Sequence, residues 1–141
     1  MKYFKLIYLS VFFGIVSILA FFNITYSYYL NLYLNLNTYI ITFVVSILLT
    51  ILFYYSKNND EKKITIYDKI LTILLGYFLL PLVISIPFYF SIYNLTFVNA
   101  FFESISGFTS TGFTIFNNIN HIDQSLILWR SASQWIGGLY F

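Results

Sequence analysis

The sequence predicts an all-α integral membrane protein, and three observations lead to this fold class. Apolar stretches of transmembrane length follow one another along the 141 residues, 60% of the residues are hydrophobic, and only 9% are charged. An ordinary soluble domain is about 25% charged, and a fold of this size leaves roughly a third of its chain surface in water. A soluble globular enzyme is therefore excluded. The net charge of +2 gives no support to nucleic-acid binding, so we expect membrane lipid to surround most of the chain.

Residues 6–22 form the first apolar stretch, with seventeen residues and no charge. A helix of this length measures roughly 26 Å, and continuation to Leu30 is ample for a hydrocarbon core of about 30 Å. Lys2 and Lys5 before it would also suit a signal peptide, but the apolar core is too long and no small-residue cleavage site follows. We therefore expect a retained transmembrane helix.

Residues 39–55 and 70–90 predict the second and third transmembrane helices. The third contains two prolines, and proline removes a backbone hydrogen bond and bends a membrane helix. We expect a kink near Pro81, whereas Pro87 lies near the end of the stretch and helps to terminate the helix. A last apolar stretch begins around Ser125 and is cut off at Phe141.

The basic residues predict how these helices are oriented. Six lysines lie before the first helix or between the second and the third, namely Lys2, Lys5, Lys57, Lys62, Lys63 and Lys69. Residues 23–37 and 91–128 contain no Lys or Arg. By the positive-inside rule, the N-terminus and the loop 56–68 are cytoplasmic. We expect a multi-pass protein of the cytoplasmic (inner) membrane with its N-terminus inside and residues 94–120 accessible from outside.

A short apolar helix is predicted over residues 97–107, with Thr96 as its N-cap. Its apolar face consists of Phe97, Phe101, Phe102, Ile105 and Phe108. Eleven residues give roughly 16 Å, which is half of the hydrocarbon thickness. Because this helix is too short to span the membrane and too apolar for water, we expect it to be re-entrant.

Short hydroxyl residues surround Gly112 in residues 109–114, which we call the Thr/Ser/Gly segment. Non-helical backbone at membrane depth occurs only where protein buries it or where it lines a water-filled path. A descending half-helix followed by such a segment is typical of a cation selectivity filter, in which backbone carbonyls replace the hydration shell of the ion. Glycine permits the backbone angles of the turn, and the partly negative C-terminal end of the helix points at the cation site. A hydroxyl-rich exposed loop is the alternative that these residues alone leave open.

Several motifs resemble one known family at matching spacings. Residues 102–114, FESISGFTSTGFT, resemble the first pore loop of the TrkH/KtrB family of potassium uptake proteins. Residues 126–130, LILWR, and 134–138, QWIGG, resemble the start of the following pore helix in the TrkH branch. Residues 86–88, IPF, match the end of the preceding helix. The resemblance covers residues 67–139 and is only topological over the first two helices.

The resemblance implies four helix–pore loop–helix units around a central pore, with an extra helix pair in front of them in the TrkH branch. This chain would then comprise a front transmembrane helix pair (residues 1–56), a cytoplasmic loop (57–69) and the first unit (70–141). We expect that unit to be incomplete and truncated in its last helix, because the family pattern departs at residues 138–141. The chain would be an N-terminal fragment of the family.

The resemblance also implies which residues form the site. The backbone carbonyls of Ser110, Thr111, Gly112 and Phe113 would supply a quarter of the filter, with potassium held through Ser110, Thr111 and Gly112. Thr109, Glu103 and Arg130 would support the filter from behind.

Glu103 and Arg130 are the two charges within otherwise apolar segments. An ionisable residue at membrane depth is costly and normally finds a partner inside the protein. The sequence leaves two arrangements open. Either the two side chains form a pair behind the filter, or each is separately hydrated at the outer interface.

The residue types of a hydrolase triad also occur, as His121, Asp123 and Ser125. Such triads are assembled from distant positions, whereas these three are neighbours in one loop. We therefore interpret Asp123 or Ser125 as the cap of the last helix.

The resemblance implies potassium ion uptake, with potassium as the substrate and no organic cofactor. The implied partners are the remaining pore units or a full-length homologue, a second copy in a homodimer, and a cytosolic nucleotide-binding regulatory subunit of the TrkA/KtrA kind. Two alternatives are a truncated, non-conducting membrane protein that associates with or modulates a complete transporter, and a truncation product without a role. We expect residues 1–141 alone not to restore potassium uptake, because one pore loop does not close a ring of four.

Overall fold

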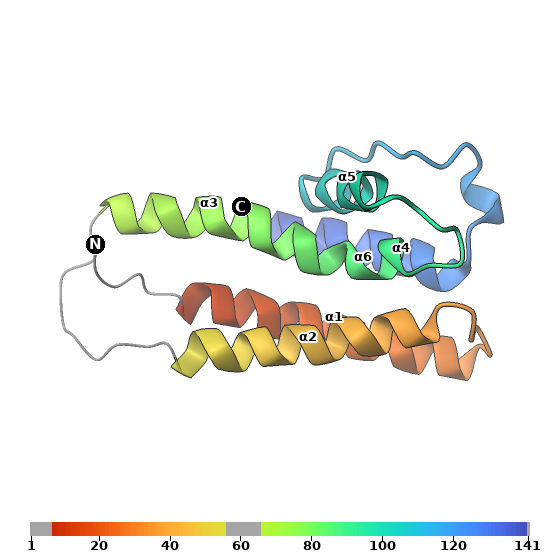
Figure 1. Cartoon of the computed structure of the whole chain (residues 1–141), viewed down its shortest axis with the longest axis horizontal. Coiled ribbons are helices and arrows are strands. Elements are labelled where there is room, and N and C mark those ends of the chain that lie inside the picture. The colour runs from red at the N-terminus through yellow and green to blue at the C-terminus, as the bar shows by residue number, and fades with distance from the viewer. Residues whose placement is uncertain (1–6, 56–65, 141) are drawn as a thin grey trace.

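The computed structural model describes residues 7–55 and 66–140 (Figure 1). Within these ranges every regular element is a helix, in the order α1 (Ile7–Tyr29), α2 (Leu36–Tyr55), α3 (Ile66–Ile84), α4 (Ile86–Tyr89), α5 (Phe97–Phe108), the 3-10 turn η1 (Ile119–His121) and α6 (Gln124–Tyr140). Three stretches of the described chain are long and apolar enough to cross a membrane, namely Tyr8–Tyr29, Leu36–Tyr55 and Lys69–Tyr89. The predicted all-α membrane fold is confirmed.

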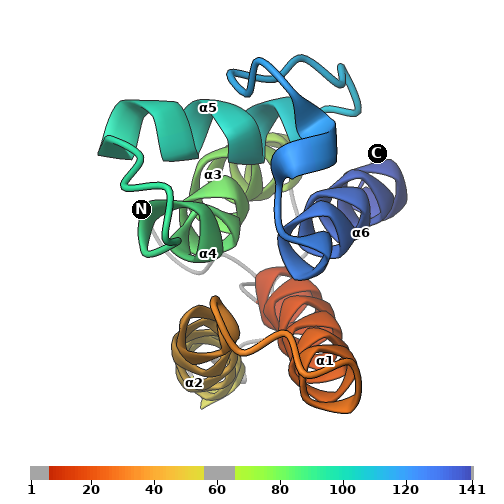
Figure 2. The ribbon, with the colours of Figure 1, turned by 90° about the vertical axis from the view of Figure 1, so that its right-hand side faces the viewer.

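The helices form three layers, which Figure 2 shows most clearly. The pair α1 and α2 makes the first layer, and α3, α4 and α6 make the second, with α6 against α1 and α4 against α2. The third layer is α5, which lies crosswise over the second layer and contacts all three of its helices (Figures 1 and 2). The sequence predicts a re-entrant, descending half-helix, and in the structure this helix lies across the helices of the second layer. Small residues on its buried face, such as Ala100, Ser104 and Gly107, permit the crossing.

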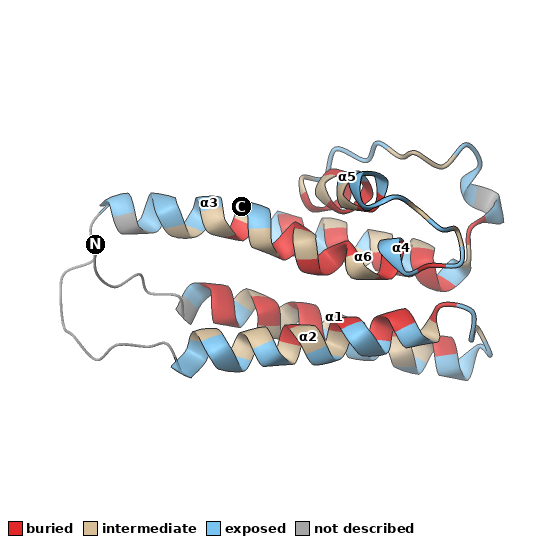
Figure 3. Ribbon diagram, in the orientation of Figure 1, coloured by how far each residue is buried: buried red, intermediate tan, exposed pale blue. Residues whose placement is uncertain are grey.

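Burial on α2 follows a pattern typical of membrane helices, whereas other helices also bury large apolar side chains such as Phe13 and Trp129. The buried side chains of α2 are hydroxyl-bearing, namely Thr38, Tyr39, Thr42 and Ser46. The Thr42 hydroxyl donates to the carbonyl of Thr38 at 2.8 Å, so its buried polar group is satisfied within the helix. Large apolar residues such as Leu48 and Leu52 are exposed on the same helix. Small hydroxyl residues between helices and apolar residues outside are typical of membrane helices, and the buried residues lie mainly where the layers meet (Figure 3).

The third predicted transmembrane helix is interrupted at Ser85. Helix α3 continues through Pro81 to Ile84, and α4 then begins at Ile86 with Pro87 in its first turn. Pro87 has no N–H to donate to the carbonyl four residues earlier, which explains an interruption just before it. The expectation that Pro87 helps to end the helix agrees with this interruption, and Pro87 then lies in the first turn of α4. Helix α3 runs through Pro81, and the kink expected there stays a prediction.

A polar cluster joins the first layer to the start of α6. Asn35 Nδ2 donates to Asp123 Oδ2 at 2.7 Å, and the hydroxyls of Tyr39 and Ser125 are 2.9 Å apart. Asp123 also caps α6, because its Oδ1 accepts from the N–H of Ser125 at 3.2 Å. The interpretation of Asp123 as a cap is therefore confirmed.

The cluster also decides against a hydrolase triad. The hydroxyl of Ser125 is bonded to Asp123 Oδ2, at 2.9 Å, and to Tyr39. His121 is exposed, and it is its backbone carbonyl that accepts a bond, from the hydroxyl of Tyr93 at 3.3 Å. A serine nucleophile needs its hydroxyl on the imidazole, which is not the arrangement of these three residues.

The end of α5 rests directly on the backbone of α6. A side-chain carbon placed on Gly137 would overlap the carbonyl oxygen of Phe108, the last residue of α5. A side-chain carbon on Gly107 would meet the hydroxyl of Ser133. These contacts fix where α5 ends and therefore where the following Thr/Ser/Gly segment begins.

Replacing Gly137 with alanine should destabilise the fold, and Gly138 offers a matched control on the same helix. The new methyl group of Gly137→Ala would collide with backbone that cannot rotate away, and overpacking costs about 1–3 kcal/mol. Nothing lies within 4 Å of a side-chain carbon on Gly138. Gly138→Ala should therefore be neutral or stabilise the helix by roughly 0.5–1 kcal/mol. Thermal unfolding in detergent, followed by circular dichroism, would measure both, and equal melting temperatures for the two variants would contradict the contact.

Candidate functional site

Helix α5 positions the side chains of the candidate site. Its N-cap is Thr96, as predicted, and the Thr96 side chain accepts from the N–H of Asn99 at 3.4 Å. The helix has apolar residues on its outer side, such as Phe97 and Phe102, which are about half exposed. Its inner side holds Glu103 and Ser106, which face the segment that follows. The helix therefore presents its polar side chains to the Thr/Ser/Gly segment.

The Thr/Ser/Gly segment folds back onto α5 (Figure 1). The N–H groups of Thr111 and Gly112 donate to the carbonyl of Ser106 at 3.1 and 3.3 Å. The hydroxyl of Ser106 donates in turn to the carbonyl of Phe113 at 2.6 Å. One serine thus holds three consecutive residues of the segment.

Two residues of the segment adopt left-handed backbone angles. Ser110 has a φ of 56° and Gly112 a φ of 79°. A side-chain carbon on Gly112 would have open space around it, since nothing lies within 4 Å. Glycine is therefore favoured here by its backbone angle and not by lack of room.

The four residues that the sequence predicts as filter residues lie together on the surface of the described chain. Ser110, Thr111, Gly112 and Phe113 are all exposed. Thr109, predicted to support them, donates through its hydroxyl to the carbonyl of Ile105 at 2.8 Å.

Glu103 is a fully buried carboxylate that the end of the segment surrounds with donors. Its Oε1 accepts from the hydroxyl of Thr114 and from the N–H of Ile115, both at 2.6 Å. Bonds from two donors, one of them backbone, compensate for part of the cost of burying this oxygen.

Arg130 reaches from α6 to both Glu103 and the segment. Its Nε lies 3.2 Å from Glu103 Oε2, and its side chain is 15% exposed. Of the two arrangements that the sequence left open, the structure therefore has the ion pair. Arg130 Nη2 donates to the carbonyls of Gly112 and Phe113 at 2.7 and 3.0 Å. The guanidinium consequently joins α5, α6 and the segment.

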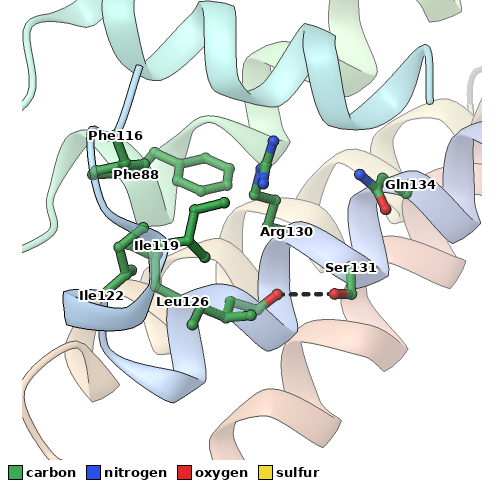
Figure 4. Close-up of a pocket in the computed structure, with 9 residues that line it drawn as sticks. Phe88, Phe116, Ile119, Ile122, Leu126, Arg130, Ser131 and Gln134 are labelled. Atoms are coloured by element: carbon green, nitrogen blue, oxygen red, sulfur yellow. Dashed lines mark hydrogen bonds between the residues drawn. The ribbon is translucent and has the colours of Figure 1, made fainter. Parts of the chain in front are cut away.

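A small cavity of about 80 Å³ lies beside Arg130 (Figure 4). Apolar side chains form most of its wall, including Phe88, Phe116 and Leu126, and the polar side chains are those of Arg130, Ser131 and Gln134. The Ser131 hydroxyl is bonded to the carbonyl of Ile127 at 3.1 Å. Within the described residues, no group of three His, Cys, Asp or Glu side chains is placed to hold a metal ion.

Sequence reasoning missed two features of this site. It assigned no role to Ser106, although Ser106 makes more bonds to the segment than any residue predicted to support it. It also did not predict the bonds from Arg130 to the two carbonyls. Residues 106 and 113 do not belong to one repeating pattern in the sequence, so only the fold of the turn reveals the role of Ser106.

The architecture defines a class of protein: an all-α membrane protein in which a half-length helix, α5, carries a glycine-containing segment beside α6. The TrkH cation transport protein family matches residues 35–141 of this chain. The chain belongs to this family, as the resemblance in its pore-loop motifs predicted.

Several curated relatives share part of the sequence. The uncharacterized cation transporter MJ1485 of Methanocaldococcus jannaschii is 31% identical over 62% of this chain and 18% of its own length. The Trk system potassium uptake protein TrkI of Halomonas elongata is 43% identical over 43% of this chain and 11% of its own length. The Trk system potassium uptake protein TrkH of Escherichia coli is 30% identical over 62% of this chain and 18% of its own length. The chain thus spans less than a fifth of each of these relatives, and no solved structure matches it.

The hydroxyl of Ser106 should stabilise the segment locally, and Ser104 provides a matched control. Ser106→Ala removes the bond to the Phe113 carbonyl, which is worth about 1 kcal/mol and corresponds to roughly fivefold faster amide exchange. Ser104 is buried on the same helix, but its hydroxyl bonds within the helix, to the carbonyl of Phe101. Hydrogen–deuterium exchange of residues 111–115 should therefore accelerate in Ser106→Ala and stay unchanged in Ser104→Ala. Equal exchange in the two variants would contradict the role given to Ser106.

Proposed function

We propose that this chain takes part in potassium uptake across the cytoplasmic membrane, as part of the pore-forming component of a Trk-type transporter. The observation that carries the proposal is the Thr/Ser/Gly segment, in which Gly112 is left-handed and the backbone is held from two sides by Ser106 and Arg130. Membership of the TrkH family and the potassium uptake relatives support potassium as the transported ion.

In this proposal the segment supplies one quarter of a selectivity filter. The carbonyls of Ser110, Thr111 and Gly112 would replace part of the hydration shell of the ion. The Phe113 carbonyl, which accepts from Ser106 and Arg130, would keep the end of the segment in place. Thr109, Glu103 and Arg130 would support the segment, together with Ser106. Residues 1–56 would form the front helix pair, residues 57–69 a cytoplasmic loop and residues 70–141 the first helix–pore loop–helix unit.

A complete ring of carbonyls requires further pore loops, either from other pore units or from a full-length homologue. A second copy of the transporter and a cytosolic nucleotide-binding regulatory subunit would be the other partners. The chain would conduct no ions by itself, so the rival function is association with a complete transporter without conduction. Potassium uptake by an assembled transporter that contains this segment would favour the pore-forming role over association without conduction.

Substitution of Gly112 tests the filter. Residues 35–141 would replace the corresponding segment of Escherichia coli TrkH in cells that lack their own potassium uptake systems. Because a residue other than glycine is strained in the left-handed region, Gly112→Ser should move the neighbouring carbonyls from their positions and lower the potassium-to-sodium permeability ratio. Gly138→Ser, at an open helical position, is the control and should leave the ratio unchanged. An unchanged ratio in Gly112→Ser, or a chimaera without uptake, would count against the filter.

The proposed orientation has its own test, because the sequence contains no cysteine and single cysteines can be labelled cleanly. Asn118 is exposed at the end of the bundle that carries α5, and Asn59 lies outside the described residues. The lysine distribution predicts that an impermeant thiol reagent labels Asn118→Cys from outside intact cells and Asn59→Cys only after the cells are opened. Labelling of position 59 in intact cells would reverse the proposed orientation.

A further inference from the structure

The Thr/Ser/Gly segment has a positive charge directly against two of its carbonyls. Arg130 Nη2 is 2.7 Å from the carbonyl oxygen of Gly112 and 3.0 Å from that of Phe113. The Phe113 carbonyl also accepts from the hydroxyl of Ser106, so both of its lone pairs are used. A guanidinium in this position anchors the backbone well. It would also repel any cation that approached the same carbonyls, because like charges only a few ångströms apart repel each other even near a protein surface.

Glu103 cancels that charge. Its carboxylate is fully buried, and Oε2 lies 3.2 Å from Arg130 Nε. Neither of these two atoms has a hydrogen-bond partner among the described residues, so the attraction between them is Coulombic. Oε1 is held by Thr114 and Ile115, which keeps the carboxylate in place independently of Arg130.

We propose that Glu103 is a specificity-determining residue that keeps the Thr/Ser/Gly segment open to cations by neutralising Arg130. Arg130 supplies the hydrogen bonds that hold the Gly112 and Phe113 carbonyls, and Glu103 removes the electrostatic cost that this anchor imposes on a cation. Glu103 acts by neutralising the charge of Arg130, so it is a positioning residue and not a ligand of the ion. The inference rests on the proposed function, since it assigns a role within the proposed filter.

The potential at the segment can be measured on the 141-residue chain itself, without transport. A single cysteine at Ser110, which is exposed, would report it in the cysteine-free chain purified in detergent. The measured quantity is the ratio of the modification rates by a cationic and a neutral methanethiosulfonate reagent of similar size. A change in accessibility alters both rates, whereas a change in charge alters their ratio. A cysteine at Tyr55, which is exposed at the far end of α2, is the control site.

The charge assignment predicts opposite changes in the two single variants. In Glu103→Gln the uncompensated guanidinium should lower the cationic-to-neutral ratio at position 110 by about fivefold. In Arg130→Gln the uncompensated carboxylate should raise it by a similar factor. The double variant, Glu103→Gln with Arg130→Gln, should return the ratio to within about twofold of the original, and all ratios at position 55 should stay unchanged.

A purely structural brace predicts a different result. Both single variants and the double variant would then change the two rates together and leave the ratio where it was, which would overturn the proposal. Should Glu103→Gln fail to fold, Arg130→Gln and the double variant still decide between the two readings. If Gly112→Ser leaves ion selectivity unchanged while the rate ratios follow the prediction, the filter assignment fails and the charge balance stands. If the selectivity changes and the ratios do not, only this inference fails.

Discussion

The buried carboxylate of Glu103 is the constraint on which the site depends. A charge with no access to solvent is costly to bury unless donors and an opposite charge surround it. Here the donors come from residues 114 and 115 and the opposite charge from α6. Because these partners belong to different parts of the chain, satisfying one side chain brings the returning segment and α6 to the same side of α5. The exposed residues 110–113 connect the end of α5 to residues 114 and 115, which bind Glu103.

The same requirement governs the packing of the long helices. Lipid offers no hydrogen bonds, so polar side chains are buried between helices and satisfied there. Thr42 bonds within α2, Tyr39 bonds to Ser125 across the layers, and Asn35 bonds to Asp123 at the end of the bundle. The first layer is thus tied to α6 by polar contacts, and α6 in turn carries Arg130. The first layer therefore helps to set the position of the guanidinium.

Hydropathy and length were sufficient to predict the fold class and the existence of the helices, because lipid imposes a long apolar stretch on each spanning helix. The length of α5, which is about half of the hydrocarbon thickness, was predicted from its number of residues, and its Thr96 cap was predicted from capping preferences. The end of α3 just before Pro87 also agrees with the sequence, because proline lacks the N–H that would continue the helix. The crosswise placement of α5 did not follow, because it depends on contacts with other helices.

Within the site, the sequence predicted which residues gather but not how they bond. Glu103 and Arg130 stood out as charges in apolar surroundings, and that signal is strong because such charges are expensive. Ser106 gave no comparable signal, since a serine in a helix is ordinary and its partner lies seven residues away in a non-repeating turn. A hydrogen bond from a side chain to a backbone carbonyl is hard to predict from sequence, because every residue supplies a carbonyl.

The segment is held by three contacts of different range. Ser106 ties it to α5 over a few residues, Arg130 ties it to α6 across 17 and 18 residues, and the contact of Gly137 with Phe108 fixes α5 on α6. Any two of these contacts alone would let the segment move with one of the two helices, α5 or α6, relative to the other. With the third, a displacement of either helix strains a hydrogen bond or a backbone contact. In the proposed filter, the carbonyls would replace a hydration shell at fixed distances and would require this closed support. The small residues that permit the close contact of α5 with α6 would then be as much a part of the site as the carbonyls.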